Sequence, residues 1–301
     1  MKLTILGCHS ATPRHDANPT SQVLEVKGHL FLIDCGEGTQ VQLRRFKIKF
    51  ARVKHIFISH LHGDHFFGLV GLVSTFRLLG READLHIYGP KGIKEAITLQ
   101  LKLGKSWTNY NLCFHELESD EPTILFEDEK VTVTTIPLHH RVYTNGFLFQ
   151  EKVGERKLDI EAVEAAKIDR SYFKKIKQGH DVLSEEEKII ANKEITLDPD
   201  PVKSYAYCGD TAYFPQVIPQ ITDVTALYHE ATFLDEHQDL AIKTMHSTAR
   251  EAATIAKSAQ VGTLILGHYS GRYGNLEDFK AEAQEVFKNV QLAEDGKAFE
   301  L

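Results

Sequence analysis

The sequence predicts an α/β fold, on three observations. Short apolar runs rich in β-branched residues, such as Val53–Ile58 and Thr263–Leu266, alternate with longer apolar segments of helical length, such as Phe66–Leu79. Polar residues of the kinds that bind metals follow several of the short runs. Loops at the carboxyl ends of strands are where α/β folds place their chemistry. We therefore expect a sheet-based core with a functional site at one sheet edge.

Composition describes an ordinary soluble globular protein. Of 301 residues, 42% are hydrophobic and 26% charged, and the net charge of -7 gives no global sign of a nucleic-acid binder. The four cysteines are far apart and form no CxxC pair, so we expect reduced thiols and a cytoplasmic protein. The first apolar run is too short for a signal-peptide core, and no stretch approaches a membrane span, so no membrane association is expected.

Local signals give the expected elements in order. Lys27-Gly28-His29 separates two strand-like runs and predicts a hairpin; Pro90 precedes a helix, and Ser247 or Thr248 can cap another, with Glu251 in its first turn. Strands are expected at 2–8, 22–26, 30–34, 53–58, 85–89, 112–117, 124–127, 131–137, 147–149, 205–208, 225–228 and 263–266. Helices are expected to end near residue 46, to cover 66–79 and 93–103, to begin at 246–248, and to cover 275–288.

The interval of about 151–200 differs from the rest of the chain. It is rich in charge and short of large apolar clusters, with helical patches near Ile160–Lys167 and Glu185–Asn192. We interpret it as an insertion that projects from the main body.

The most informative stretch is Ser59-His60-Leu61-His62-Gly63-Asp64-His65. His60 and His62 point to the same side of an extended segment, while Gly63 lets the chain turn before Asp64 and His65. Imidazole suits Zn²⁺ or iron and carboxylate suits harder ions, so this set can serve more than one metal ion. A polar surface loop is the alternative, but four ligand-type side chains in six positions favour a metal site.

The same pattern recurs farther along the chain. His140, Asp210, Glu230 and His268 each follow an apolar strand. One such residue is usually an ordinary loop end, whereas recurrence at several strand ends is what a shared site at one edge of a sheet pair would produce.

These motifs resemble those of a known family. His60-x-His62-x-Asp64-His65 is similar to the signature of the metallo-β-lactamase superfamily, which implies a four-layer αββα sandwich, here with an inserted, protruding arm. Together with six further motifs, this signature resembles the ribonuclease Z (tRNase Z) family over nearly the full chain. The further motifs are Gly36-Glu37-Gly38-Thr39-Gln40, His140-x-Val142, Gly209-Asp210-Thr211, His229-Glu230-Ala231-Thr232, His246-Ser247-Thr248 and Gly267-His268-Tyr269-Ser270-x-Arg272-Tyr273. The segments around Glu230 and His246 are the family-specific part.

The resemblance implies a zinc-dependent endoribonuclease that removes the 3′ trailer of precursor tRNA, leaving a 3′-hydroxyl on the tRNA and a 5′-phosphate on the trailer. Two divalent ions per chain are expected, Zn²⁺ first, with Mn²⁺ or Fe²⁺ as alternatives. His60, His62 and His140 would hold one ion, Asp64, His65 and His268 the other, and Asp210 would bridge them. His140 is preferred to His139 by its spacing to Gly146. Asp64 would assist the attacking water, and His246, held by Glu230, would be the general acid.

The resemblance also implies a homodimer and a single domain over 1–301 whose arm clasps the tRNA; no DNA substrate is expected. A basic cluster in the insertion fits recognition of RNA phosphates: Lys167, Arg170, Lys174, Lys175 and Lys177.

Two places depart from the family. Asp169-Arg170-Ser171 replaces a Gly-Pro turn. The loop Pro13–Asn18 lacks the Lys and Arg of a Pro-x-Lys-x-Arg-Asn pattern, so the rejection of CCA-bearing substrates does not carry over.

Two other functions are consistent with the metal signature. A small-molecule phosphodiesterase of the same fold would need no arm. A diiron redox protein is disfavoured, because that group has Glu where His62 stands and usually carries a flavin domain.

Overall fold

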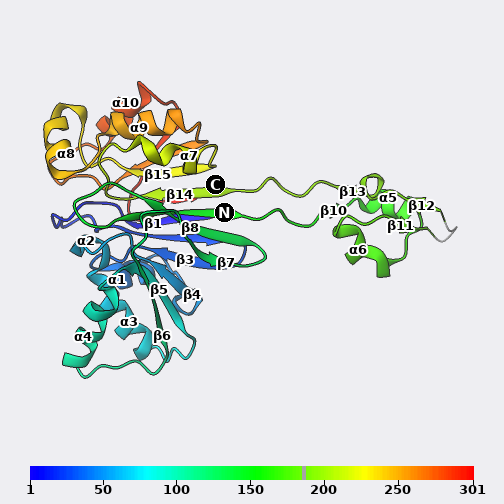
Figure 1. Cartoon of the computed structure of the whole chain (residues 1–301), viewed down its shortest axis with the longest axis horizontal. Helices are drawn as coiled ribbons and strands as arrows, with labels where there is room; N and C mark the ends of the chain where they lie inside the picture. Colours follow the sequence, from blue (N-terminus) through cyan, green and yellow to red (C-terminus); the bar gives the residue numbers. More distant parts are fainter. Residues whose placement is uncertain (185–187) are drawn as a thin grey trace. The chain divides into compact units, whose positions relative to one another are not determined.

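Two seven-stranded β-sheets dominate the computed structural model, which describes residues 1–184 and 188–301 (Figure 1). The contacts divide the chain into two units. Met1–Gln150 and Lys203–Leu301 form the first unit, which contains both sheets, and Glu151–Val202 forms the second.

The first sheet has the strand order β18-β1-β2-β3-β4-β5-β6. β1 to β3 pair antiparallel, and β3 to β6 pair parallel. The helices that follow the parallel strands pack on this sheet and on each other. The bounds are β18 (Ala298–Glu300), β1 (Lys2–Gly7), β2 (Ser21–Val26), β3 (His29–Ile33), β4 (Val53–Phe57), β5 (Leu85–Pro90), β6 (Leu112–Leu117), α1 (Thr39–Arg45), α2 (Gly63–Phe66), α3 (Gly68–Leu78) and α4 (Ile93–Leu103).

The second sheet has the order β17-β16-β15-β14-β9-β8-β7. β14 to β17 are parallel, and β9 joins β14 antiparallel. α9 packs on β15 and β16, and α10 packs on α9 and β17. The bounds are β7 (Ile124–Glu127), β8 (Val131–Pro137), β9 (Asn145–Glu151), β14 (Ser204–Cys208), β15 (Ala226–Glu230), β16 (Thr263–Gly267), β17 (Val290–Leu292), α7 (Ile218–Ile221), α8 (Gln238–Thr244), α9 (Ala249–Ser258) and α10 (Glu277–Gln284).

The first unit therefore has four layers, α, β, β and α (Figure 1). Phe57 of the first sheet meets Phe147 of the second, with ring centroids 5.4 Å apart, inside a core that joins the sheets. A second core under α1, α3 and α4 contains Leu32, Ile56 and Leu72. Alternate residues of β3 and β4 enter the two cores, as the period of a strand requires. The predicted αββα sandwich is confirmed.

The predicted helix over 66–79 is instead two helices that meet at Phe67. The break brings α3 against the loop after β3. A Cβ on Gly68 would lie 2.0 Å from the carbonyl oxygen of Gly36, and one on Gly36 would lie 2.4 Å from that of Asp64. Only glycine permits the backbone to come this close, so Gly36 and Gly68 hold the segment 63–68 against the loop that follows β3.

The second unit has its own small apolar core of Val163, Ile168, Ile176, Val182 and Ile195. Its elements are β10 (Lys157–Leu158), α5 (Ile160–Ala165), α6 (Phe173–Lys177), β11 (Val182–Leu183), β12 (Ile189–Ile190) and β13 (Thr196–Leu197), with short 3₁₀ turns at Arg170–Tyr172 and Asn192–Glu194.

The first helical patch expected in the insertion is present as α5, capped by Asp159, whose carboxylate accepts a bond from the Ala162 N–H. The second was wrong over its described part: residues 185–187 lie outside the described residues, and β12 follows them and pairs with β11. The segment Asp169-Arg170-Ser171 stands where the family has a Gly-Pro turn. Here the Asp169 carboxylate accepts a hydrogen bond from the Ser171 N–H at 2.8 Å and caps the 3₁₀ turn Arg170–Tyr172.

Across residues 1–184 and 188–301, no helix has the length and apolarity needed to cross a bilayer.

Candidate metal centre

The seven predicted metal ligands meet at one edge of the two sheets. His60, His62, Asp64 and His65 follow β4 of the first sheet, and Asp210 and His268 follow β14 and β16 of the second. His140 lies between β8 and β9, while His139 stacks on Phe214 and belongs to none of the groups of metal-ligand side chains.

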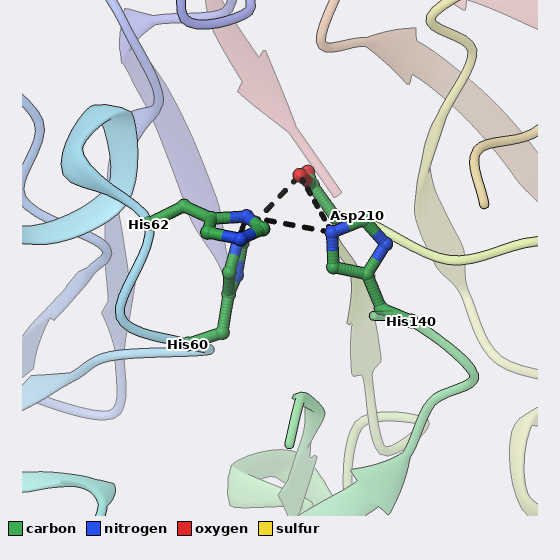
Figure 2. Close-up of side chains that lie close together, drawn as sticks. All are labelled: His60, His62, His140 and Asp210. Carbon is green, nitrogen blue, oxygen red and sulfur yellow. Dashed lines mark hydrogen bonds and ion pairs between the residues drawn. The ribbon is translucent and has the colours of Figure 1, made fainter. Parts of the chain in front are cut away.

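One group consists of His60, His62, His140 and Asp210 (Figure 2). The Nδ1 atom of His62 lies 2.9 Å from Nε2 of His60 and 3.4 Å from Nε2 of His140. Oδ2 of Asp210 lies 3.5 Å and 3.8 Å from the Nε2 atoms of His60 and His140. Three imidazole nitrogens and one carboxylate oxygen thus face a common point, as four-coordinate zinc sites require.

A second group consists of Asp64, His65 and His268, and a third, overlapping one of Asp210, His246 and His268. In the second group, the Nε2 atoms of the two histidines are 3.4 Å apart, and Oδ2 of Asp64 lies 3.5 Å from that of His65 and 3.3 Å from that of His268. Oδ1 of Asp210 faces this group, 3.2 Å and 3.1 Å from the same two nitrogens. The two oxygens of Asp210 are therefore turned toward different groups.

The Asp210 carboxylate gives a test of whether cations fit. Its Oδ1 is buried and makes no hydrogen bond, although two imidazole nitrogens lie close to it. Burial alone would raise the pKa of Asp210, but His268, His65 and His60 hold it well below its usual range. An oxygen of a buried, ionised carboxylate that makes no hydrogen bond needs positive charge beside it. The residues present fit two divalent cations that share this carboxylate.

Hydrogen bonds behind the histidines fix their orientation. Four of the five predicted histidine ligands have their Nδ1 atom against a protein oxygen, which leaves Nε2 facing the centre. The contacts are His60 with Ser59 Oγ at 3.0 Å, His65 with Asp34 Oδ2 at 2.7 Å, His140 with the Met245 carbonyl at 2.8 Å, and His268 with Thr232 Oγ1 at 2.8 Å.

Asp34, which the sequence interpretation did not single out, lies behind His65 and Ser59. Its buried carboxylate accepts hydrogen bonds from Ser59 N, Ser59 Oγ and Tyr207 OH at 2.7, 2.8 and 2.6 Å, besides its contact with His65. It ends β3 in a left-handed conformation, with φ of 53°. The signal was available, because Asp34 is one more polar residue directly after an apolar strand.

Glu230 and His246 form the predicted pair. The Glu230 side chain is fully buried, and its Oε1 lies 2.7 Å from Nδ1 of His246. It also accepts bonds from Thr211 N, Thr232 N and Thr232 Oγ1. Burial would lower the pKa of His246, but the carboxylates of Glu230 and Asp210 outweigh it and raise that pKa to about 9. His246 is thus protonated at neutral pH.

His246 reaches the site from the segment between α8 and α9. α9 begins at Ala249 behind a capping box of Thr248 and Glu251, which decides between the two predicted caps. The Ser247 hydroxyl instead donates to the Thr211 carbonyl. A pocket of about 400 Å³ opens over the centre, with Asp64, His246, His268 and the exposed Arg141 in its wall. Arg141 was not predicted, although it directly follows a ligand.

The remaining predicted residues lie elsewhere. Asn18 of the Pro13–Asn18 loop donates to Asp295 at 2.8 Å, which ties this loop to the C-terminal part of the fold. The five basic residues of the insertion are exposed in the second unit: Lys167, Arg170, Lys174, Lys175 and Lys177.

Comparison with known proteins places this centre in a family. The chain is 45% identical over 300 residues to Ribonuclease Z of Bacteroides fragilis, covering 100% of this chain and 99% of that protein. It is 46% identical over 294 residues to Ribonuclease Z of Bacteroides thetaiotaomicron, covering 98% and 93%. The family model described as anti-Pycsar protein Apyc1 matches residues 1–158.

Solved structures agree with this placement. The short form of human tRNase Z superposes with a TM-score of 0.73 at 27% identity, covering 100% of this chain and 99% of that one. A metallo-β-lactamase fold protein from Bacillus subtilis, with a TM-score of 0.69 at 19% identity and coverage of 99% and 98%, supports the fold alone. The chain has a metallo-β-lactamase fold, and its first 158 residues match the Apyc1 family model. Because its sequence identity to curated relatives extends over the full length, the chain belongs to the ribonuclease Z family.

Proposed function

We propose that the chain hydrolyses one phosphodiester bond of precursor tRNA at the start of the 3′ trailer, with two zinc ions bound around Asp210. Membership of the ribonuclease Z family makes it a metal-dependent endoribonuclease of tRNA 3′-end processing. The observation that carries the rest is the pair of ligand groups that share one buried carboxylate.

We assign His60, His62 and His140 to one ion, Asp64, His65 and His268 to the other, and Asp210 to both. The set has only imidazole and carboxylate donors, a combination that zinc accepts readily and that Mn²⁺ and Fe²⁺ also accept. Two cations bound here would supply positive charge to the phosphate and lower the pKa of a water molecule between them.

The chain's own residues would perform the proton transfers. Asp64, whose pKa is lowered mainly by His65 and His268 against the effect of burial, orients the attacking water and accepts its proton. The water oxygen attacks phosphorus while the bond to the 3′ oxygen breaks. His246, held by Glu230, donates its proton to that leaving oxygen. The products are a 3′-hydroxyl on the tRNA and a 5′-phosphate on the trailer.

The second unit would bind the tRNA away from the scissile bond. Its five exposed cations stand against one acid, Asp169, in the segment 167–177, and Lys175 lies 5.9 Å from the ring centre of Tyr172. Such a cluster on an acidic protein suits recognition of the phosphate backbone by shape. We propose that this unit is the substrate-binding arm of a single catalytic domain.

A homodimer in the cytoplasm completes the proposal, with one subunit's arm serving the other's active site. Apolar side chains exposed on adjoining elements of the first unit support an additional contact surface: Val41 on α1, and Phe67 and Leu78 at the two ends of α3. Light scattering should give twice the chain mass of 34.0 kDa.

The decisive experiment uses a precursor tRNA labelled at its 5′ end. We expect one labelled product that ends at the trailer junction, and periodate should oxidise its terminus because a 3′-hydroxyl leaves a free ribose diol. The Asp210→Ala variant is the matched control and should leave the RNA intact. An enzyme that hydrolyses bis(p-nitrophenyl) phosphate but leaves every precursor uncut would instead be the small-molecule phosphodiesterase.

The arm is tested by a deletion that the fold allows. Gln150 of β9 pairs with Ser204 of β14, so two added residues followed by Lys203 can form a three-residue hairpin loop in place of residues 151–202; of the two strands, only Glu151 at the end of β9 is lost. We expect precursor cleavage to fall at least about a hundredfold, while hydrolysis of bis(p-nitrophenyl) phosphate stays within about threefold, because phosphate contacts supply much of the affinity for nucleic acid. Equal loss on both substrates would mean that this unit is structural.

A further inference from the structure

A separate group of potential metal ligands lies on the edge of the first sheet. Asp84, His86 and Cys113 each offer one ligand atom, and these atoms lie within 4.8 Å of one another. The group shares no residue with the centre around Asp210, and the proposed hydrolysis does not use it.

The pairing of β5 with β6 brings these side chains together. His86 and Cys113 are direct partners in the parallel ladder, so their side chains leave the same face of the sheet as neighbours. Asp84 lies directly before β5, two residues from His86, and its ligand atom is within 4.8 Å of those of His86 and Cys113. The Asn111 side chain donates to Oδ1 of Asp84 at 2.8 Å and holds the carboxylate in place, as residues behind metal ligands commonly do.

A fourth side chain extends the group. His115 pairs with Tyr88, two residues beyond the His86–Cys113 pair, so it is on the same face. Its Nε2 atom lies 3.1 Å from Nδ1 of His86. In the centre around Asp210, nitrogens of ligand histidines approach to between 2.9 and 3.4 Å. The His86–His115 pair has the same close approach.

Cys113 differs from the other cysteines in being accessible. Cys8, Cys35 and Cys208 are buried, and burial raises the pKa of Cys35 and Cys208 to about 12. Cys113 is half-buried, and β6 is the last strand of its sheet, so an ion can reach the thiol from solvent. A thiolate is the ligand form of cysteine, and a bound cation favours it.

We propose that Asp84, His86 and Cys113 bind one further Zn²⁺ ion, with His115 beside its open coordination position. One oxygen, one nitrogen and one sulfur donor suit a borderline ion such as zinc better than magnesium or calcium. The ion joins β5 to the edge strand β6 and stabilises that edge, because it binds the folded pair and not the unfolded chain.

Cobalt substitution tests this site separately from the catalytic centre. The Asp210 centre has only nitrogen and oxygen ligands, so a thiolate-to-cobalt charge-transfer band in the near ultraviolet can come only from a cysteine. We expect the metal-free chain to develop this band when it is titrated with Co²⁺. Cys113→Ser should abolish the band, and His86→Ala should weaken Co²⁺ binding at the site at least about tenfold. His15→Ala, which changes a histidine with a 94% exposed side chain, is the matched control and should keep the band.

Zinc content and activity supply the second measurement. After dialysis against Zn²⁺, the wild-type chain should hold three ions and Cys113→Ser two, with cleavage of precursor tRNA unchanged. Unchanged cleavage shows that the variant folds. The proposal is overturned if Co²⁺ gives no charge-transfer band, or if the band survives in Cys113→Ser.

Discussion

Replacing Asp34 tests how a residue with no place in the reaction supports the metal centre. Asp34→Ala removes the acceptor of three hydrogen bonds, from Ser59 N, Ser59 Oγ and Tyr207 OH, and the partner of His65 Nδ1. Each buried donor left without an acceptor costs about 1–3 kcal/mol. Some relaxation and water entry are expected, so we place the loss in unfolding free energy at about 3–5 kcal/mol, the range for breaking a buried charged network.

The same substitution should weaken metal binding, because His65 loses the contact that orients its ring. Loss of such an outer partner typically lowers affinity about 10–100-fold. Urea unfolding of the chelator-treated protein measures the stability term without metal, and competition with a chromophoric chelator measures affinity. Tyr207→Phe is the matched control: it removes one donor, leaves Asp34 to hold His65, and should cost only about 1 kcal/mol. The reasoning fails if Asp34→Ala and Tyr207→Phe have equal effects on metal affinity.

The remaining predictions concern the reaction and its substrate. Asp210→Ala should lose both ions and all cleavage; elemental analysis that found one ion per chain in an active variant would contradict a bridging role. His246→Ala should lower precursor turnover by about 10²–10⁴-fold with metal content unchanged, and should affect a nitrophenyl ester far less, because a good leaving group needs little protonation. Glu230→Gln should move the basic limb of the pH–rate profile to lower pH, since the proton donor exists only below the pKa of His246 and the Glu230 carboxylate raises that pKa. Below the new limb the variant should regain most of its rate. Raising the salt concentration should weaken precursor binding steeply in the intact chain and much less after deletion of residues 151–202.

The sequence predicted the structure best where several metal-ligand residue types lie close together along the chain. Apolar runs followed by His60–His65, Asp210 and His268 indicated both the strands and the edge where they end. The position of Asp34 directly after an apolar strand was a local signal, but its partners, Ser59 and Tyr207, are 25 and 173 positions away along the chain, so the sequence could not show what its carboxylate binds. The short strands β17 and β18 were missed for a related reason. Three-residue segments have no measurable period, and their pairing with β16 and β1 decides their structure.

The ligands of the metal centre come from both sheets, four from the loop after β4 and three from the second sheet. Bound cations would therefore cross-link the two sheets at the edge where β4, β14 and β16 end, as a disulfide cross-links two segments of a chain. Ion binding and sheet docking are then thermodynamically linked, since only the docked arrangement presents all seven ligands. Removing the ions should loosen the two halves along this edge before either sheet unfolds, and hydrogen exchange at the ends of β4, β14 and β16 would report that separation.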